Sequence, residues 1–382
     1  MKKNGIKTLA VSMTTMALLL SGVGCEAKTD TDTATHITKE ETATDSVETA
    51  AAEPAGTEPA VNISDSYDNT EELAARFPVV NPTPIDTQME KNIQNRLLNG
   101  FENWNRGYET WEAWGDILYT PDSLYNVHGV KLTLKEYQSS MNAQLKSSDI
   151  QMGNFHNMII SGDWAAIRYD ISTTDRQSEK SSDGSVMEFV HFKDYGDERG
   201  TRVVEGWAGT KGEDFEQVSS FQNDNEKAAQ QESLDAIVHK EIPDTTDLEA
   251  KYPVTSPTPI DSDMGKKIKD VILNDFEKWN QGFDSWEKWA DTYYDSSLQY
   301  HTSKDTLNLS EYKAAMKESA DSTDTKRIQF DNMLISGDWA AIHYRITNED
   351  KTTGEKTAGD VMQFLHFAQD GDQLKVIESW TK

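Results

Sequence analysis

The stretch that decides the fold is NMIISGDWAAI at positions 157–167, which recurs as NMLISGDWAAI at 332–342. Each copy places a Gly-Asp pair between two apolar runs, which is typical of two antiparallel strands joined by a tight turn. Outward from this stretch, a constant shift aligns 77–192 with 252–367 without a gap, and about fifty positions are identical. The chain therefore contains two tandem copies of one module.

Each copy predicts three helices followed by strands. Apolar residues at helical spacing predict a first helix that ends at Gly107 or Gly282. We expect a Trp-rich second helix that runs into Tyr125 or Tyr300, and a third that begins at Thr133 with a capping box. Strands are predicted at 155–161, 164–173, 186–193 and 201–207. The fold class is α+β, with helices covering one face of a largely antiparallel sheet.

Composition limits the kind of partner. The 382 residues carry 66 acidic and 37 basic side chains, a net charge of −29. Such a charge argues against nucleic acid as a partner, because binding relies on neutralising phosphates with Lys and Arg. A single cysteine excludes an internal disulfide framework and a thiolate metal cluster.

The N-terminal segment has the layout of a secretory signal, with lysines, a short apolar run and small residues that end at Cys25. Positions 21–25 resemble a bacterial lipobox, which implies cleavage of signal peptide 1–24, lipid attachment (palmitate included) at Cys25 and an extracytoplasmic, membrane-anchored protein. The alternative is an ordinary signal peptide that happens to contain a cysteine. The composition of 25–69 predicts an acidic, disordered stalk.

The remaining boundaries follow from the repeat. Module 1 spans 70–208, a polar linker spans 209–245, and module 2 spans 246–382. A helix near 226–240 is predicted in the linker, with Leu234, Ile237 and Val238 packed against a module.

Each module resembles the SnoaL-like branch of the nuclear-transport-factor-2-like superfamily, on its long first helix, Trp-rich second helix, Gly-Asp-Trp-Ala-Ala hairpin and terminal Val-Glu-x-Trp strand. The resemblance implies a cystatin-like cone, in which three helices close a strongly curved sheet around a pocket. Because members of the family commonly dimerise through the outer sheet face, it also implies that the two modules form an internal pseudo-dimer. Members include cyclases, isomerases and dehydratases alongside non-catalytic binding domains, so fold alone does not decide function.

The resemblance also implies a pair of acid–base residues in each cone. In SnoaL-like cyclases a His and an acid on two late strands carry out catalysis, which corresponds to His191 with Glu205 and His366 with Glu378. We expect these pairs to face the concave side, where burial raises the pKa of a carboxylate. The alternative is a buried His–Glu hydrogen bond that only satisfies two polar groups.

Six aromatic residues are candidates for contact with a ligand. The alternative for each is that it packs in the hydrophobic core and contacts no ligand. The set comprises Trp111, Tyr125 and Trp207 in module 1 and Trp286, Tyr300 and Trp380 in module 2. No motif for phosphate, dinucleotide or metal binding occurs, so we expect no cofactor and no metal site.

Three functions are compatible with these observations. The first is a lipid-anchored protein whose modules bind a small, partly apolar ligand or serve as an interaction platform. The second is a cofactor-free isomerase, cyclase or dehydratase. The third is a structural role, with filled cones and outer sheet faces that bind a protein partner. An open cone with inward-pointing His and Glu favours the first two functions, and a filled cone favours the third.

Overall fold

The computed structural model describes residues 63, 65–127, 129–196, 199–210, 224–302 and 305–382. The signal peptide, Cys25 and most of the predicted stalk lie outside these residues. Within the described part of the chain, no helix is long and apolar enough to cross a membrane.

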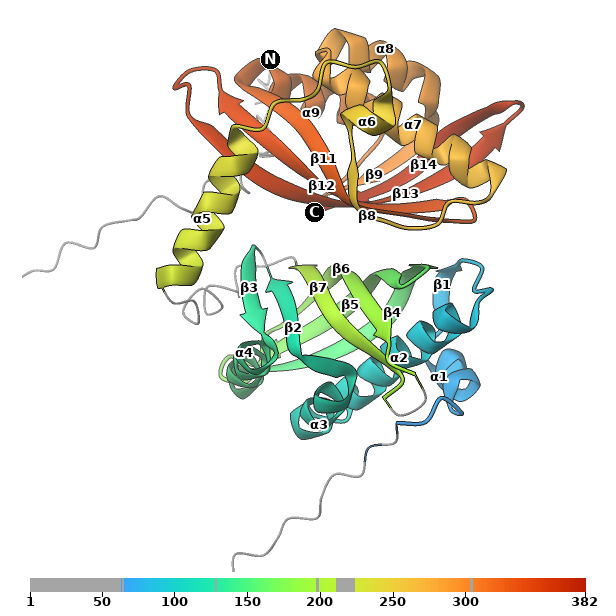
Figure 1. Ribbon diagram of the computed structural model, residues 1–382, viewed down its shortest axis with the longest axis vertical. Coiled ribbons are helices and arrows are strands. Elements are labelled where there is room, and N and C mark those ends of the chain that lie inside the picture. Colours follow the sequence, from blue (N-terminus) through green and yellow to red (C-terminus); the bar gives the residue numbers. More distant parts are fainter. Residues whose placement is uncertain (1–62, 64, 128, 197–198, 211–223, 303–304) are drawn as a thin grey trace, which may run out of the picture.

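Two seven-stranded sheets, each with its own helices, form the two halves of the molecule (Figure 1). Module 1 contains α1 (Thr70–Arg76), β1 (Val79–Pro82), α2 (Gln88–Asn105), α3 (Tyr108–Leu118), β2 (Tyr119–Val127), β3 (Val130–Thr133), α4 (Leu134–Ser147), β4 (Ser148–Ser161), β5 (Trp164–Asp175), β6 (Ser181–Asp194) and β7 (Thr201–Thr210). Its strand order is β1-β4-β5-β6-β7-β2-β3.

Module 2 repeats this arrangement with the corresponding strand order β8-β11-β12-β13-β14-β9-β10. Its elements are α6 (Leu248–Lys251), β8 (Val254–Pro257), α7 (Asp263–Asn280), α8 (Phe283–Tyr293), β9 (Tyr294–His301), β10 (Thr306–Leu307), α9 (Leu309–Ser322), β11 (Thr323–Ser336), β12 (Trp339–Asp350), β13 (Lys356–Asp370) and β14 (Gln373–Thr381). The α+β fold class expected from the sequence is confirmed. The linker helix is present as α5 (Asp224–Val238), and Leu234, Ile237 and Val238 are half-buried.

Local sequence explains where the helices begin and the sheets bend. The Thr133 hydroxyl accepts from the backbone of Glu136, whose carboxylate accepts from the Thr133 backbone, so the predicted capping box is confirmed. The register of β4 shifts on both sides of Phe155 against β5. Such bulges bend a strand, and here they help to curve the sheet around its helices.

Tyr125 and Tyr300 are not at the ends of helices, contrary to our expectation. The second helix ends at Leu118, and Tyr125 lies on β2, parallel to β7. Pro121 follows closely after the helix, and a proline disfavours helical backbone in the residue before it. The strands β1, β2 and β3 were not predicted either, since they are short, edge-lying or interrupted by proline.

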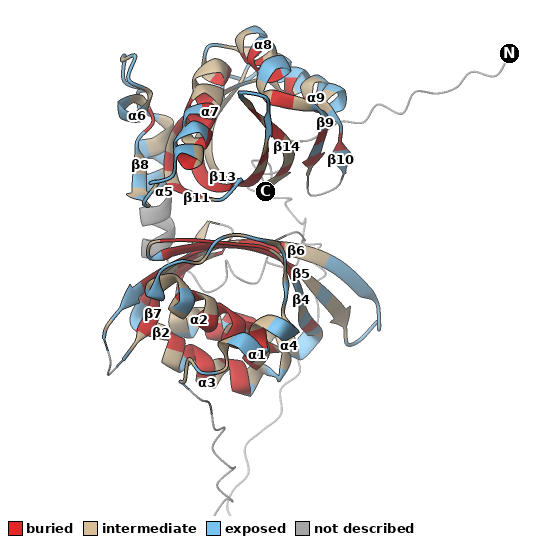
Figure 2. Ribbon diagram, turned by 90° about the vertical axis from the view of Figure 1, so that its right-hand side faces the viewer, coloured by how far each residue is buried: buried red, intermediate tan, exposed pale blue. Residues whose placement is uncertain are grey.

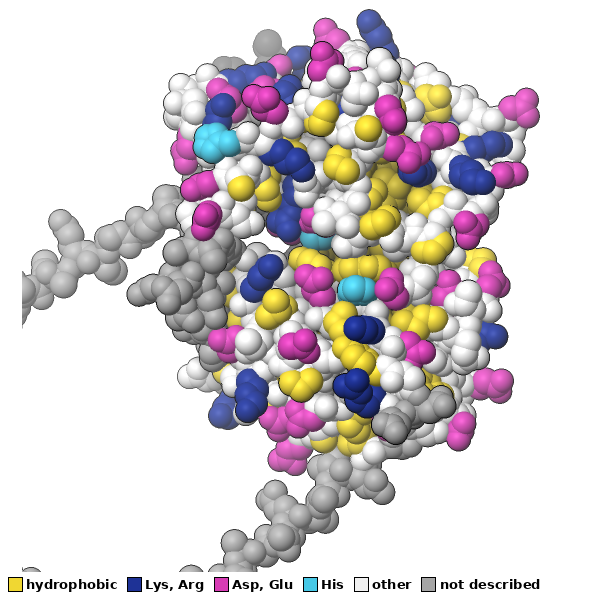
Figure 3. All heavy atoms as spheres, viewed as in Figure 1, with side chains coloured by type: hydrophobic (Ala, Val, Ile, Leu, Met, Phe, Trp, Pro, Cys, Tyr) yellow, Lys and Arg dark blue, Asp and Glu magenta, His cyan; other side chains and the backbone are white. Residues whose placement is uncertain are grey.

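The two sheets pack face to face, with the helices on the far sides (Figure 2). Ten buried side chains make up the cluster between them: Ile159, Trp164, Ala166, Met187 and Phe189 from module 1, and Leu334, Trp339, Ala341, Met362 and Phe364 from module 2. We call this cluster the inter-module core. Figure 3 shows hydrophobic side chains gathered along the seam between the modules.

The contact is reciprocal, because each Gly-Asp hairpin meets the proline-rich segment of the other module. The Ser161 hydroxyl donates to the carbonyl of Pro259 at 3.2 Å, and the Ser336 hydroxyl donates to the carbonyl of Pro84 at 3.4 Å. The same surface is therefore used on both sides, as in a two-fold symmetric dimer.

Candidate functional site

His191 and Glu205 lie on the outer face of the sheet. Met187 and Phe189, which belong to the inter-module core, share a face with His191 because side chains alternate along a strand. Val190 and Phe192 point the other way, into the core under the helices. His191 lies directly opposite Glu205 in the register, as does His366 opposite Glu378. The predicted pairs are therefore neighbours, but the expectation that they face the inside of the cone is wrong.

The two histidines hold the Gly-Asp turns. The His191 ring stacks on Trp164 with centroids 4.4 Å apart, and its Nε2 is 3.1 Å from the Asp163 carboxylate. In module 2 the His366 ring stacks on Trp339 at 4.3 Å. These contacts hold the Gly-Asp hairpins in place, and the hairpins contact the other module. The two histidines therefore have a structural role.

Glu378 and His366 affect one another's ionisation. Although burial raises the pKa of Glu378, the His366 ring at 3.8 Å and a hydrogen bond from Trp380 lower it below its usual value. The neighbouring carboxylates of Glu378 and Asp338 raise the pKa of His366. In module 1 the balance differs, because burial raises the pKa of Glu205. Folding therefore favours the negatively charged form of Glu378 and the positively charged form of His366.

The carboxylate that does enter the cone of module 1 is Glu188 on β6. Its Oε2 accepts from the Tyr125 hydroxyl at 2.8 Å and its Oε1 from the Tyr169 hydroxyl at 2.7 Å. Burial raises the pKa of Glu188, although the two hydroxyls act in the opposite direction. A carboxylate with a raised pKa and two ordered phenols is suited to binding a polar group or holding a proton.

Four tyrosines surround this carboxylate, and we call them the tyrosine cage: Tyr119, Tyr125, Tyr137 and Tyr169. Tyr125 stacks on Tyr137 with centroids 4.5 Å apart, and Tyr119 meets both of them edge to face. Burial raises the pKa of every tyrosine in the cage. The phenols remain protonated at neutral pH, and those of Tyr125 and Tyr169 donate to Glu188.

Gly206 on β7 makes room for the cage. A Cβ at this position would be 2.3 Å from the Tyr125 ring, closer than any real contact. The glycine therefore leaves the space that the Tyr125 ring occupies as it reaches Glu188.

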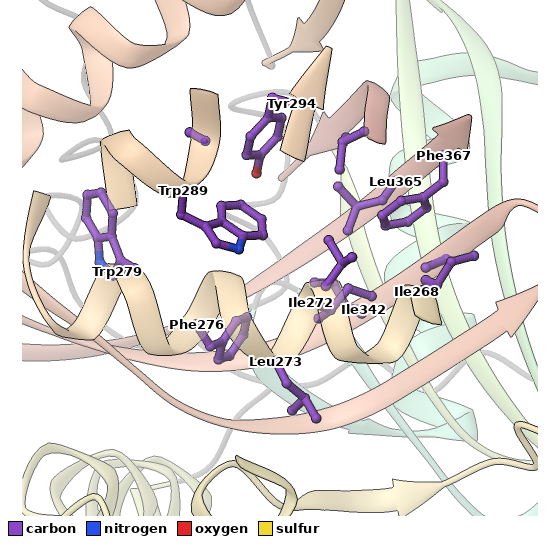
Figure 4. Packing of buried hydrophobic residues seen from close by; sticks show 14 of the residues in the cluster. Ile268, Ile272, Leu273, Phe276, Trp279, Trp289, Tyr294, Ile342, Leu365 and Phe367 are labelled. Carbon is purple, nitrogen blue, oxygen red and sulfur yellow. The ribbon is translucent and has the colours of Figure 1, made fainter. Parts of the chain in front are cut away.

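Module 2 repeats the cage without its carboxylate. Tyr294, Tyr300, Tyr312 and Tyr344 occupy the matching positions, and Gln363 stands where module 1 has Glu188. The Gln363 amide donates to the Ser379 hydroxyl at 2.8 Å. A buried ion pair joins Arg327 to Asp275, which also accepts from the indole of Trp286 at 2.9 Å. Figure 4 shows Phe276, Trp289 and Tyr294 in the space between the helices and the sheet.

The two cages differ in accessibility. Glu188, Tyr119 and Tyr137 each retain a share of solvent-accessible surface. Their counterparts Gln363, Tyr294 and Tyr312 are buried, at 7%, 4% and 2% exposure. Tyr125 and Tyr169 are buried, at 3% exposure each, like Tyr300 and Tyr344 at 3% and 5%. The surroundings of Glu188 are therefore covered less completely than those of Gln363, on the side of Tyr119 and Tyr137.

The predicted aromatic contacts fall into three groups. Trp111 and Trp286 are core residues, at 5% and 0% exposure. Trp207 and Trp380 lie at the seam between the modules. Tyr125 and its counterpart Tyr300 belong to the cages, and Tyr300 stacks on Tyr312. Three of the six donate to a carboxylate: Tyr125 to Glu188, Trp286 to Asp275 and Trp380 to Glu378.

Glu188 was missed by the sequence reasoning, although a signal existed. It is an acid in the otherwise apolar run Val186–Val190, at a position where module 2 has an uncharged glutamine. Among the described residues, no group of three or more His, Cys, Asp or Glu could hold a metal ion.

Comparison with known proteins gave matches to solved structures only. Neither a protein-family model nor a curated protein sequence matches the chain. A ketosteroid isomerase-like protein from Erwinia carotovora atroseptica is 12% identical, with a TM-score of 0.27, and the match covers 33% of this chain and 99% of that one. A proposed SnoaL-like polyketide cyclase from Mesorhizobium loti is 13% identical, with a TM-score of 0.25 and coverage of 30% and 97%. ActVI-ORFA from Streptomyces coelicolor is 11% identical, with a TM-score of 0.26 and coverage of 30% and 94%.

Proposed function

We propose that module 1 binds a small, partly apolar molecule in its cone, with Glu188 as the polar anchor, and that module 2 is a closed copy that supports it. The observation that carries this proposal is the difference in accessibility between the two cages. Glu188, Tyr119 and Tyr137 are half-buried, whereas Gln363, Tyr294 and Tyr312 are buried. We therefore propose ligand binding for module 1 and not for module 2.

The cage selects the chemistry of the ligand. Each oxygen of Glu188 accepts one tyrosine hydroxyl, and a carboxylate oxygen has a further lone pair for a ligand hydroxyl or N–H group. The rings of Tyr119 and Tyr137 supply apolar walls. We expect a compact ligand with one hydrogen-bond donor and an apolar body.

The raised pKa of Glu188 favours a second candidate, a cofactor-free enzyme that moves a proton beside a carbonyl group. In this version Glu188 replaces the His–Glu pairs as the acid–base residue. The Tyr125 and Tyr169 hydroxyls hold its two oxygens and orient the carboxylate. Turnover of a bound ligand would distinguish this candidate from simple binding.

Native mass spectrometry of the chain purified in the presence of source-cell extract tests the proposal. We expect one ligand per chain, lost on Glu188→Gln and retained on the matched control Gln363→Glu. Glutamine is close in volume to glutamate, and Gln363 stands at the matching position of module 2. A chain that carries no ligand in several extracts, or an adduct that survives Glu188→Gln, would contradict the assignment.

We also propose that lipid at Cys25 anchors the chain to a membrane outside the cytoplasm and that the modules act as an internal pseudo-dimer. Incorporation of labelled palmitate, abolished by Cys25→Ser, would test the anchor. Because the outer sheet faces contact one another in the inter-module core, a protein partner is not expected to bind there.

A further inference from the structure

We propose that module 1 carries a second binding site, for a small aromatic carboxylate, in a hollow at the turn between α2 and α3. The hollow has a volume of about 340 Å³, is open to solvent, and is bordered by α4 and the start of β4. Its size is within the range of small-molecule sites. None of the cage residues lines it, so the site does not depend on the function proposed for Glu188.

Three cations surround the hollow: Arg106, Lys146 and Arg176. None of them forms an ion pair with any residue in the described part of the chain. A hydrogen bond of 3.2 Å from Arg176 Nε to the carbonyl of Leu145 holds that guanidinium beside the end of α4. Two carboxylates, Glu109 and Asp149, also line the hollow, which leaves one net positive charge in a chain whose net charge is −29.

The walls of the hollow include apolar side chains on which a flat ring can lie. Trp104 is fixed by a 2.9 Å hydrogen bond from its indole Nε1 to the carbonyl of Ile150. Leu145 and Tyr108 also line the hollow and are half-exposed. Free cations beside an apolar wall favour a ligand with an acidic group on an aromatic body.

Module 2 lacks this combination at the matching positions. Gln281 and Asp321 replace Arg106 and Lys146, and Ala320 and Thr325 replace Leu145 and Ile150. The third cation is kept, because Lys351 stands at the position of Arg176 and donates to the carbonyl of Ala320. Lys317 pairs with Asp321 at 3.0 Å, so positive charge there is neutralised within the protein. The cations Arg106 and Lys146, and the apolar side chains of Leu145 and Ile150, are therefore specific to module 1.

Calorimetric titration of the full chain with 1-naphthaleneacetate, and with its neutral analogue 1-naphthaleneacetamide, tests the proposal. We expect one binding site and at least tenfold tighter binding of the acid than of the amide at low ionic strength. This preference should shrink in about 0.5 M salt, because salt screens exposed charges.

The variant Arg106→Gln/Lys146→Gln/Arg176→Gln should bind acid and amide equally, with an unchanged circular dichroism spectrum. Lys317→Gln in module 2 is the matched control and should leave the preference intact, as should Glu188→Gln. Equal binding of the two probes by the native chain, absence of binding, or a preference that survives the triple substitution would overturn the proposal. Loss of binding on Glu188→Gln instead would place the ligand in the cone and overturn it equally.

Discussion

Trp380 is the side chain on which we expect contact between the modules to depend most strongly. Its ring lies between the Arg168 guanidinium of module 1, 3.7 Å from the ring centre, and the His301 ring of module 2, also at 3.7 Å. Its indole Nε1 donates a 2.8 Å hydrogen bond to Glu378. Arg168 is 1% exposed, and burial lowers its pKa to about 10, although Glu378 and Asp170 act in the opposite direction.

We expect Trp380→Ala to lower the free energy of unfolding by about 4–5 kcal/mol, the upper part of the range for Trp→Ala in packed sites. About 2 kcal/mol of this comes from the desolvated cation–π contact with Arg168. A further ~1 kcal/mol comes from the hydrogen bond to Glu378. Urea unfolding of the full chain, followed by far-ultraviolet circular dichroism, measures the loss.

Trp207→Ala is the matched control, because Trp207 occupies the corresponding place on β7. Its ring contacts Trp164 and His343 at 5.6 and 5.8 Å, and no Arg or Lys lies over it among the described residues. Its removal should therefore cost about 2–3 kcal/mol less than that of Trp380. Equal losses for the two variants would refute the assignment of a specific role to the Arg168 contact.

Three further predictions concern the cage and the seam. Gly206→Ala should destabilise the chain by at least about 1–3 kcal/mol, because the added methyl group meets the Tyr125 ring; an unchanged melting temperature would contradict the close approach. Glu188→Gln should stabilise the chain near pH 8 and not near pH 4. The raised pKa of Glu188 means that its ionised form is disfavoured by folding, so stability is lost as pH rises through the folded value; a gain that does not vary with pH would contradict this. The pair of Glu378 and His366 should contribute most between about pH 4.5 and 6.5. The lowered pKa of Glu378 makes its contribution disappear in acid, and the raised pKa of His366 makes its contribution disappear as pH rises; His366→Gln should flatten the upper limb of the stability profile.

Much of the fold was predictable because the sequence pattern of each helix and strand occurs twice, once in each module. The Gly162 turn, the capping box at Thr133 and the register of His191 with Glu205 follow from local patterns. The position of Tyr125 on a strand did not follow from local patterns. The Trp-rich helix and the strand after it are both rich in aromatic residues, so composition alone does not separate them. The clearest local mark of the boundary between the helix and the strand is Pro121, which lies within β2.

The candidate site was harder to predict for a physical reason. Alternation along β6 tells which side chains share a face, but both faces of this strand are apolar. Phe189 packs against the other module and Phe192 against the helices. Which face is concave depends on the bulges that bend the sheet and on the helices of the same module that pack against it, and these contacts are long-range in sequence. The pattern therefore grouped His191 correctly with Phe189 and assigned both to the wrong side.

The reciprocal contact between the hairpins has a consequence for how the two halves can evolve. In a dimer of identical chains, a substitution at one position changes both subunits at once. Here the two halves are encoded separately, so Glu188 can persist in one cone while Gln363 stands in the other. Each half keeps the surface that binds its neighbour, through Ser161 and Ser336, and is otherwise free to specialise. Tandem duplication thus permits a division of labour, in which one half recognises a ligand and the other provides a rigid support.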